Sequence, residues 1–194
     1  MTRSDNLYEV PTGLPVPIDD GACRHLPGMA VAPCVLTSTR GREVSLRDAC
    51  MGKRVVVFAY PRTGRPDRDP PPGWNAIPGA RGCTPQTCGF RDRYQELTSL
   101  GALVFGLSTQ DTDYQQEVAG RLGLPFELLS DTQLELTRAM QLPTFSVEGM
   151  TLLKRFTLIL RDGRVEEVLY PVFPPDESAS EVVRWLTAAE ARAR

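Results

Sequence analysis

Two cysteines separated by four residues, Cys83 and Cys88, are the side chains of this sequence whose types and spacing most directly suggest chemistry. Both lie in the stretch ARGCTPQTCGFRDRY (80–94), where the recurrence of apolar residues predicts the start of an amphipathic helix. Such a pair could bind a metal ion, react as a redox pair, or pack as two small hydrophobic side chains.

Metal binding is the weakest of these three interpretations. A structural zinc site needs about four nitrogen or sulfur ligands. The chain contains a single histidine, His25, and only three further cysteines, Cys23, Cys34 and Cys50, without a second pair of matching spacing. For these three cysteines, core packing or a free thiol is the simpler interpretation.

The position of Cys83 favours redox chemistry. This cysteine follows Gly82 at the start of the predicted helix, after a buried strand and a loop. The N–H groups of a first helical turn point towards such a sulfur, and the helix dipole adds partial positive charge. Both effects favour the thiolate, which is the nucleophilic form of cysteine.

The spacing of the two cysteines implies a conformational change. Five residues of α-helix rise by about 7.5 Å and leave the two Cα atoms roughly 8.7 Å apart. A disulfide requires a Cα separation below about 7 Å. A disulfide between Cys83 and Cys88 can therefore form only if the first turns of the helix unwind.

The elements around this pair predict one α/β domain. A hairpin over 35–46, buried strands over 55–60 and 102–108, and a helix over 112–122 surround the cysteine-bearing helix; a short helix near 132–140, a hairpin over 153–173 and a final helix from Ser178 follow. This order predicts a mixed central sheet with helices on both faces. We assign it to residues 34–194, with residues 1–33, which are rich in Pro and Gly, as an N-terminal extension packed on the domain.

Composition removes several functional classes. The 194 residues are 41% hydrophobic and 24% charged, as in globular proteins. A formal net charge of −2 gives no electrostatic basis for binding nucleic acid or an anionic membrane. We find no stretch resembling a signal peptide and no apolar run long enough to cross a bilayer, so we expect a cytoplasmic protein, in which structural disulfides are rare.

Five segments in order along the chain resemble the peroxiredoxins of the Q type, the bacterioferritin-comigratory-protein group. They are VVVFAYP (55–61), GCTPQTCGFRD (82–92), GLSTQD (106–111), LPFELLSD (124–131) and KRFTLILRDG (154–163). The resemblance implies a thioredoxin fold and thiol-dependent peroxidase activity. It makes Cys83 the peroxidatic cysteine and Cys88 the resolving cysteine, joined as an intramolecular disulfide during turnover.

The family site also contains an arginine from a distant strand, and Arg155 matches it. Arg155 alternates with Thr157 and Ile159, which places the three side chains on one face of the predicted strand. The alternative is that Arg155 is a surface residue in an ion pair.

The sequence departs from the family before the cysteine. The family has Pro and Thr (or Ser) seven and three residues ahead of it, where this chain has Ala76 and Ala80. Pro61 and Thr63 follow the strand as expected but about fifteen residues early, which indicates a long insertion. Either the extra residues loop out and the Thr63 hydroxyl reaches the Cys83 sulfur, which we favour, or this hydroxyl role is lost. The insertion is then a lid, a partner surface or a passive surface loop.

The resemblance implies a cycle without a metal, flavin or nucleotide cofactor. The expected partners are a hydroperoxide substrate and a reductant of the thioredoxin or glutaredoxin type, with the protein a monomer or a weak homodimer. Two other functions fit the same fold: a thiol–disulfide oxidoreductase, which usually has a Cys-x-x-Cys motif, and a non-enzymatic redox sensor.

Overall fold

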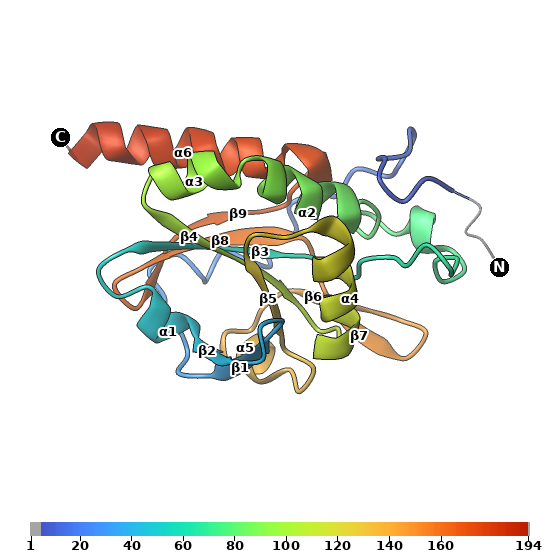
Figure 1. Cartoon of the computed structure of the whole chain (residues 1–194), viewed down its shortest axis with the longest axis horizontal. Helices are drawn as coiled ribbons and strands as arrows, with labels where there is room; N and C mark the ends of the chain where they lie inside the picture. Colours follow the sequence, from blue (N-terminus) through green and yellow to red (C-terminus); the bar gives the residue numbers. More distant parts are fainter. Residues whose placement is uncertain (1–4, 194) are drawn as a thin grey trace.

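A seven-stranded mixed sheet forms the centre of the protein, whose computed structural model describes residues 5–193 (Figure 1). The strand order is β2-β1-β5-β4-β3-β8-β9. Only the pairs β3–β4 and β4–β5 are parallel; the other neighbours are antiparallel. The strands are β1 (Val35–Ser38), β2 (Glu43–Ser45), β3 (Arg54–Ala59), β4 (Ala102–Ser108), β5 (Glu127–Ser130), β8 (Phe156–Arg161) and β9 (Arg164–Leu169), and a separate hairpin pairs β6 (Thr144–Val147) with β7 (Met150–Leu153).

Helices cover both faces of this sheet, as the sequence predicts. In Figure 1, α2 (Cys83–Asp92), α3 (Tyr94–Ser99) and α6 (Ser178–Ala193) lie on one side, and α1 (Leu46–Ala49) and α5 (Glu135–Ala139) on the other. The helix α4 (Thr112–Leu122) buries Val118 and Leu122 in the same cluster as α2 and α6. The prediction of a mixed thioredoxin-like sheet between helices is confirmed. Within the described residues, no helix combines the length and the apolar character that crossing a bilayer requires.

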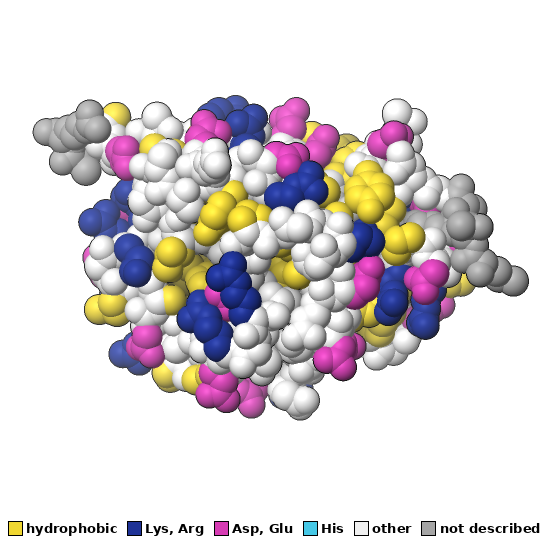
Figure 2. Space-filling view, in the orientation of Figure 1, with side chains coloured by type: hydrophobic (Ala, Val, Ile, Leu, Met, Phe, Trp, Pro, Cys, Tyr) yellow, Lys and Arg dark blue, Asp and Glu magenta, His cyan; other side chains and the backbone are white. Residues whose placement is uncertain are grey.

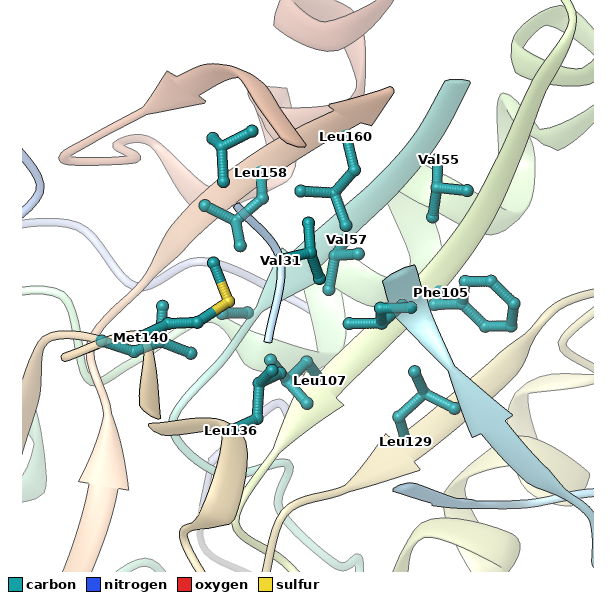
Figure 3. Close-up of a cluster of buried hydrophobic side chains, with 14 of the residues drawn as sticks. Val31, Val55, Val57, Phe105, Leu107, Leu129, Leu136, Met140, Leu158 and Leu160 are labelled. Carbon is teal, nitrogen blue, oxygen red and sulfur yellow. The ribbon is translucent and has the colours of Figure 1, made fainter. Parts of the chain in front are cut away.

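Alternation along the central strand divides the core into two clusters. Val55 and Val57 of β3 point into the cluster drawn in Figure 3, while Val56 and Phe58 point into the cluster beneath α2 and α6. A period of two residues is what a strand buried on both faces requires. The N-terminal extension contributes to the first cluster through Val31, whose backbone N–H donates to the Gly163 carbonyl.

Two helices differ from their predicted extents. The amphipathic helix predicted to start within residues 80–94 ends at Asp92, and Arg93 separates it from a second helix, α3. The predicted helix near 132–140 begins only at Glu135, because the carboxylate of Asp131 accepts hydrogen bonds from the backbone N–H groups of Leu136 and Thr137 and the preceding residues form a turn. Side-chain competition of this kind for backbone groups is a usual reason for a late helix start.

Residues 61–82, here called the β3–α2 loop, are ordered around one aromatic side chain. Trp74 lies in a short 3-10 helix, η1 (Trp74–Ala76), and is 5% exposed. It packs with Ala80 and with Leu152 of β7, and its ring lies 6.2 Å from that of Phe145. The loop is therefore attached to the β6–β7 hairpin by a small apolar cluster of its own.

Gly82 joins this loop to α2 under two constraints. Its φ angle is 98°, a conformation that residues with a Cβ rarely adopt. A Cβ placed there would lie 2.3 Å from Cγ of Pro175, in the 3-10 helix η2 (Pro175–Glu177) that precedes α6. Only glycine allows α2 to begin this close to η2.

We expect Gly82→Ala to lower the free energy of unfolding by about 2–4 kcal/mol, since it adds backbone strain and a steric clash together. The matched control is Gly101→Ala, at a φ of 74° with no atom within 4 Å of the added Cβ, which should cost only about 1–2 kcal/mol. Urea unfolding of both variants measures the difference. Equal losses in the two variants would show that contact with Pro175 does not constrain the start of α2.

Candidate functional site

Cys83 occupies the first position of α2, and its side chain is only 2% exposed. Its Sγ atom lies 3.2 Å from Nη2 of Arg155, which donates a hydrogen bond to it. The thiol also lies 3.5 Å from the carbonyl oxygen of Ala80. The sulfur thus has a buried cation on one side and the N-terminus of a helix on the other, and both stabilise negative charge on it.

Arg155 lies just before β8 and is 3% exposed, so the alternative of a surface ion-pair residue is wrong. Its Nη2 atom faces the carbonyl oxygens of Gly79, Ala80 and Arg81 at 3.2, 3.4 and 3.0 Å, in addition to the Cys83 sulfur. Among the described residues it forms no ion pair with a carboxylate. A buried cation surrounded by neutral acceptors favours an anion nearby, and Cys83 is the partner that can become one.

Gln86 is a site residue that sequence reasoning did not identify. Its Oε1 atom accepts a hydrogen bond from Nη1 of Arg155, and its Nε2 atom donates to Oγ of Ser178 at 3.4 Å. Gln86 stands three positions after Cys83, so both side chains point from the first turns of α2 towards the same region. That spacing was the only signal available in the sequence, and on its own it does not identify a partner of Arg155.

Thr63 is buried next to the site, but its hydroxyl does not interact as predicted. The Oγ1 atom and the backbone N–H of Thr63 both donate to Oε1 of Gln110, each at 3.0 Å. Its carbonyl accepts from the hydroxyl of Tyr114 at 3.0 Å. A hydroxyl has a single proton to donate. The Thr63 hydroxyl therefore does not donate the predicted hydrogen bond to the Cys83 sulfur. Pro61, which is also buried, lies between the end of β3 and Thr63.

A cavity of about 300 Å³ opens at Cys83. Its walls combine the β3–α2 loop, the first turn of α2, Tyr114 of α4 and Leu7 of the N-terminal extension. Figure 2 shows basic, acidic and hydrophobic side chains close together on the side of the molecule where this loop lies. The lining residues from the loop are Arg62, Thr63, Gly64, Arg65, Arg68, Asp69, Pro70, Pro71, Pro72, Trp74, Arg81 and Gly82.

Thr84 is a second residue of this wall that the sequence analysis did not identify. It follows Cys83 in α2 and is 1% exposed. Its Oγ1 atom has no hydrogen-bond partner among the described residues. Because buried polar groups normally have partners, this hydroxyl is available to a molecule bound beside the sulfur.

Cys88 lies on the same continuous helix as Cys83, and both thiols are free. The Cys88 side chain is half-buried, and burial raises the pKa of its thiol despite the nearby Arg91, which acts in the opposite direction. The N-terminal extension holds the residue that precedes Gly82, since Asp5 forms an ion pair with Arg81 at 2.6 Å. This is the helical arrangement, in which the two sulfurs cannot form a disulfide.

The other three cysteines lie outside this cavity. Burial raises the pKa of Cys23 to about 12 and also raises that of Cys34. Cys50 is fully buried, and its sulfur accepts a hydrogen bond from the backbone N–H of Gly163. Across the part of the chain that the structure describes, no group of three or more His, Cys, Asp or Glu side chains is placed to hold a metal ion.

Comparison with known proteins gives consistent matches over most of the chain. The Redoxin family model matches residues 26–184. "Peroxiredoxin Q, chloroplastic" of Gentiana triflora is 30% identical over 189 residues, covering 94% of this chain and 79% of the relative, and "Peroxiredoxin bcp1" of Schizosaccharomyces pombe is 31% identical over 113 residues, covering 58% and 50%. The crystal structure of "Peroxidoxin BcpB" from Mycobacterium tuberculosis superposes with a TM-score of 0.68 at 26% identity, covering 84% of this chain and 98% of that one.

Proposed function

Because the chain belongs to the Redoxin family and within it to the peroxiredoxins of the Q type, which are thiol-dependent peroxidases, we propose that Cys83 attacks the peroxide and that Cys88 resolves the product. The observation that carries this assignment is the hydrogen bond from buried Arg155 to the Cys83 sulfur at the first turn of α2. No other cysteine of the described chain combines a buried cation, a helix N-terminus and an adjoining cavity.

In the first step, the Cys83 thiolate attacks the distal oxygen of the hydroperoxide. An S–O bond forms and the O–O bond breaks, which gives a sulfenic acid on Cys83. The second oxygen takes up a proton and leaves as water or as an alcohol. The sulfur loses two electrons and the peroxide gains them, so no metal, flavin or nucleotide is required.

The donors for the peroxide oxygens come from the first turn of α2 and from Arg155. Pro85 has no N–H group, so the first-turn N–H groups not used within the helix are those of Cys83 and Thr84. The unpartnered Thr84 hydroxyl adds a further donor. Thr63 contributes as a wall of the cavity whose position is held by Gln110 and Tyr114, with Pro61 setting the path of the chain before it.

In the second step, α2 unwinds locally and the Cys88 thiolate attacks the sulfenic sulfur. An S–S bond forms, and the oxygen leaves as water after protonation. A dithiol reductant of the thioredoxin or glutaredoxin type then returns both cysteines to thiols by exchange.

Because this cycle consumes a reduced dithiol, we place the protein in a reducing compartment, for which the cytoplasm is the simplest assignment. The plant relatives are named as chloroplastic. We propose a monomer or a weak homodimer as the working form.

Replacing Cys83 by Ser should abolish peroxide-dependent turnover while leaving the melting temperature within a few degrees of the wild type, since a hydroxyl does not ionise near neutral pH. Consumption of hydrogen peroxide with a thioredoxin system measures this directly. The control is Cys34→Ser, which removes a half-buried thiol away from the cavity and should retain turnover. Turnover by purified Cys83→Ser protein would refute the mechanism.

Cys88→Ser should consume about one equivalent of peroxide and then stop as a sulfenic acid that dimedone traps. The pH dependence of disulfide formation in the wild type tests the same step. Burial raises the pKa of Cys88 in the helical state, so deprotonation favours the unwound state as pH rises through the ordinary thiol pKa of about 8.5. We expect the resolving rate to increase over that range. Wild-type turnover by Cys88→Ser would assign the resolving role to another thiol.

Arg155→Met should slow the oxidation of Cys83 by at least about a hundredfold, because it removes the charge-assisted hydrogen bond to the thiolate. Stopped-flow oxidation of the reduced protein gives the rate constant. Thr63→Val should slow this oxidation much less, since the Thr63 hydroxyl donates its hydrogen bond to Gln110 and not to the Cys83 sulfur. The reverse order of the two effects would restore to Thr63 the direct role predicted from the sequence.

A further inference from the structure

The wall of the cavity at Cys83 has two chemically different parts. One part is apolar and includes Leu7, Trp74, Pro85 and the prolines at 70–72. The other part carries guanidinium groups: those of Arg62 and Arg65, both from the start of the β3–α2 loop, and those of Arg68 and Arg81 further along it. Hydrogen peroxide needs neither surface, since it has no carbon and no charge. A cavity of this composition fits a larger, amphiphilic molecule.

Arg62 and Arg65 are held in place by one aromatic ring. Their Cζ atoms lie 5.4 and 5.6 Å from the centroid of the Tyr114 ring, within the range of a cation–π contact. The Tyr114 hydroxyl donates to the carbonyl of Thr63, which lies between the two arginines in the sequence. The two cations are therefore positioned before any ligand arrives.

Neither guanidinium is fully satisfied by the residues that the structure describes. Arg62 is half-buried and forms no ion pair with a carboxylate of the described chain; its hydrogen bond goes to the sulfur of Met150 at 3.0 Å. Nε of Arg65 is buried without a hydrogen-bond partner, although it lies 3.4 Å from a carboxylate oxygen of Asp67. Asp67 is largely exposed, so that contact neutralises little of the Arg65 charge.

Two acidic residues also line the cavity, Asp69 and Glu148. Neither forms an ion pair with Arg62 or Arg65. The charge that a ligand meets beside Tyr114 is therefore positive, while the opposite wall is apolar. A carboxylate accepts two parallel, charge-assisted hydrogen bonds from a guanidinium, and these are stronger than hydrogen bonds to a neutral group.

We propose that Arg62 and Arg65 form an anion subsite, and that the preferred substrates are organic hydroperoxides that carry a carboxylate. The carboxylate binds beside Tyr114, the carbon skeleton lies against Trp74 and the prolines, and the hydroperoxide group reaches Cys83. The inference rests on the proposed peroxidase function of Cys83. It adds a determinant of substrate choice that lies in the β3–α2 loop and away from the reacting sulfur.

The test compares two hydroperoxides that differ only in charge: cumene hydroperoxide and its para-carboxylate derivative. Stopped-flow oxidation of the reduced wild-type protein should be about tenfold faster with the carboxylate, the change expected for one charge-assisted hydrogen bond. The ratio should fall towards one as the salt concentration increases, because added ions screen the attraction. A para-trimethylammonium derivative should be slower than both.

The variant Arg62→Met/Arg65→Met should bring the ratio to within about twofold of one, since the methionines keep the apolar stems and remove the charges. The ratio is measured within each protein, so a general effect on Cys83 cancels. Arg62→Lys, which keeps the charge without the planar fork, should retain part of the preference. The control is Arg47→Met on α1, which changes the net charge equally but lies outside the cavity and should keep the wild-type ratio.

The results of these experiments distinguish failure of the anion subsite from failure of the proposed peroxidase function. If wild-type Cys83 is oxidised equally fast by the neutral and the anionic hydroperoxide, the anion subsite is refuted and the peroxidase function stands. A preference that persists unchanged in Arg62→Met/Arg65→Met also refutes the subsite. If hydrogen peroxide and both organic hydroperoxides fail to oxidise Cys83, the proposed function itself is wrong.

Discussion

The site is organised around a buried guanidinium, that of Arg155, which has no carboxylate partner within residues 5–193. Arg155 is almost fully enclosed, and its acceptors are three backbone carbonyls, the amide oxygen of Gln86 and the sulfur of Cys83. Removing a cation from water is costly unless an anion compensates it. In the proposed mechanism a Cys83 thiolate supplies that anion, so the contact with Arg155 that positions the sulfur also prepares the nucleophile. It also fixes the end of the β3–α2 loop against the start of α2, because the carbonyls of residues 79–81 belong to the loop.

This arrangement places opposing demands on α2. Its first turn must be helical for the N–H groups to face the sulfur, whereas the proposed disulfide requires it to unwind so that Cys88 reaches Cys83. Burial of Cys88 favours the helical state, and the ion pair between Asp5 and Arg81 holds the residue just before Gly82. In the proposed cycle, conversion of Cys83 to a neutral sulfenic acid removes the anionic partner of Arg155, and the helical state then loses part of its stabilisation. Oxidation can therefore shift the balance towards the unwound state without any external signal.

Local patterns in the sequence were sufficient for most strands of the central sheet, for the longer helices and for the positions of Cys83 and Cys88, because each depends on residues that are close along the chain. They did not indicate the hairpin of β6 and β7, which follows α5. Alternation along the strand also predicted the face of the sheet on which Arg155 lies. It did not predict the backbone carbonyls of the loop that accept hydrogen bonds from Arg155. The partners of Thr63 and Gln86 could not be predicted. Each depends on the distance between atoms of segments far apart in sequence, and Gln110 provides an acceptor for the Thr63 hydroxyl that no motif indicates.

The β3–α2 loop separates the requirements of reactivity from those of substrate choice. Lengthening a loop costs little chain entropy, about 0.6 kcal/mol for each doubling, and Trp74 offsets part of this cost by packing on the β6–β7 hairpin. The hydrogen bonds from Arg155 to the loop go to its last residues, so the earlier residues can vary without disturbing the contact between Arg155 and Cys83. Arg62 and Arg65 belong to that freer part, yet Tyr114 positions both from α4. A surface loop attached at both ends to rigid elements can thus present charged groups to a substrate while the contact between Cys83 and Arg155 stays unchanged.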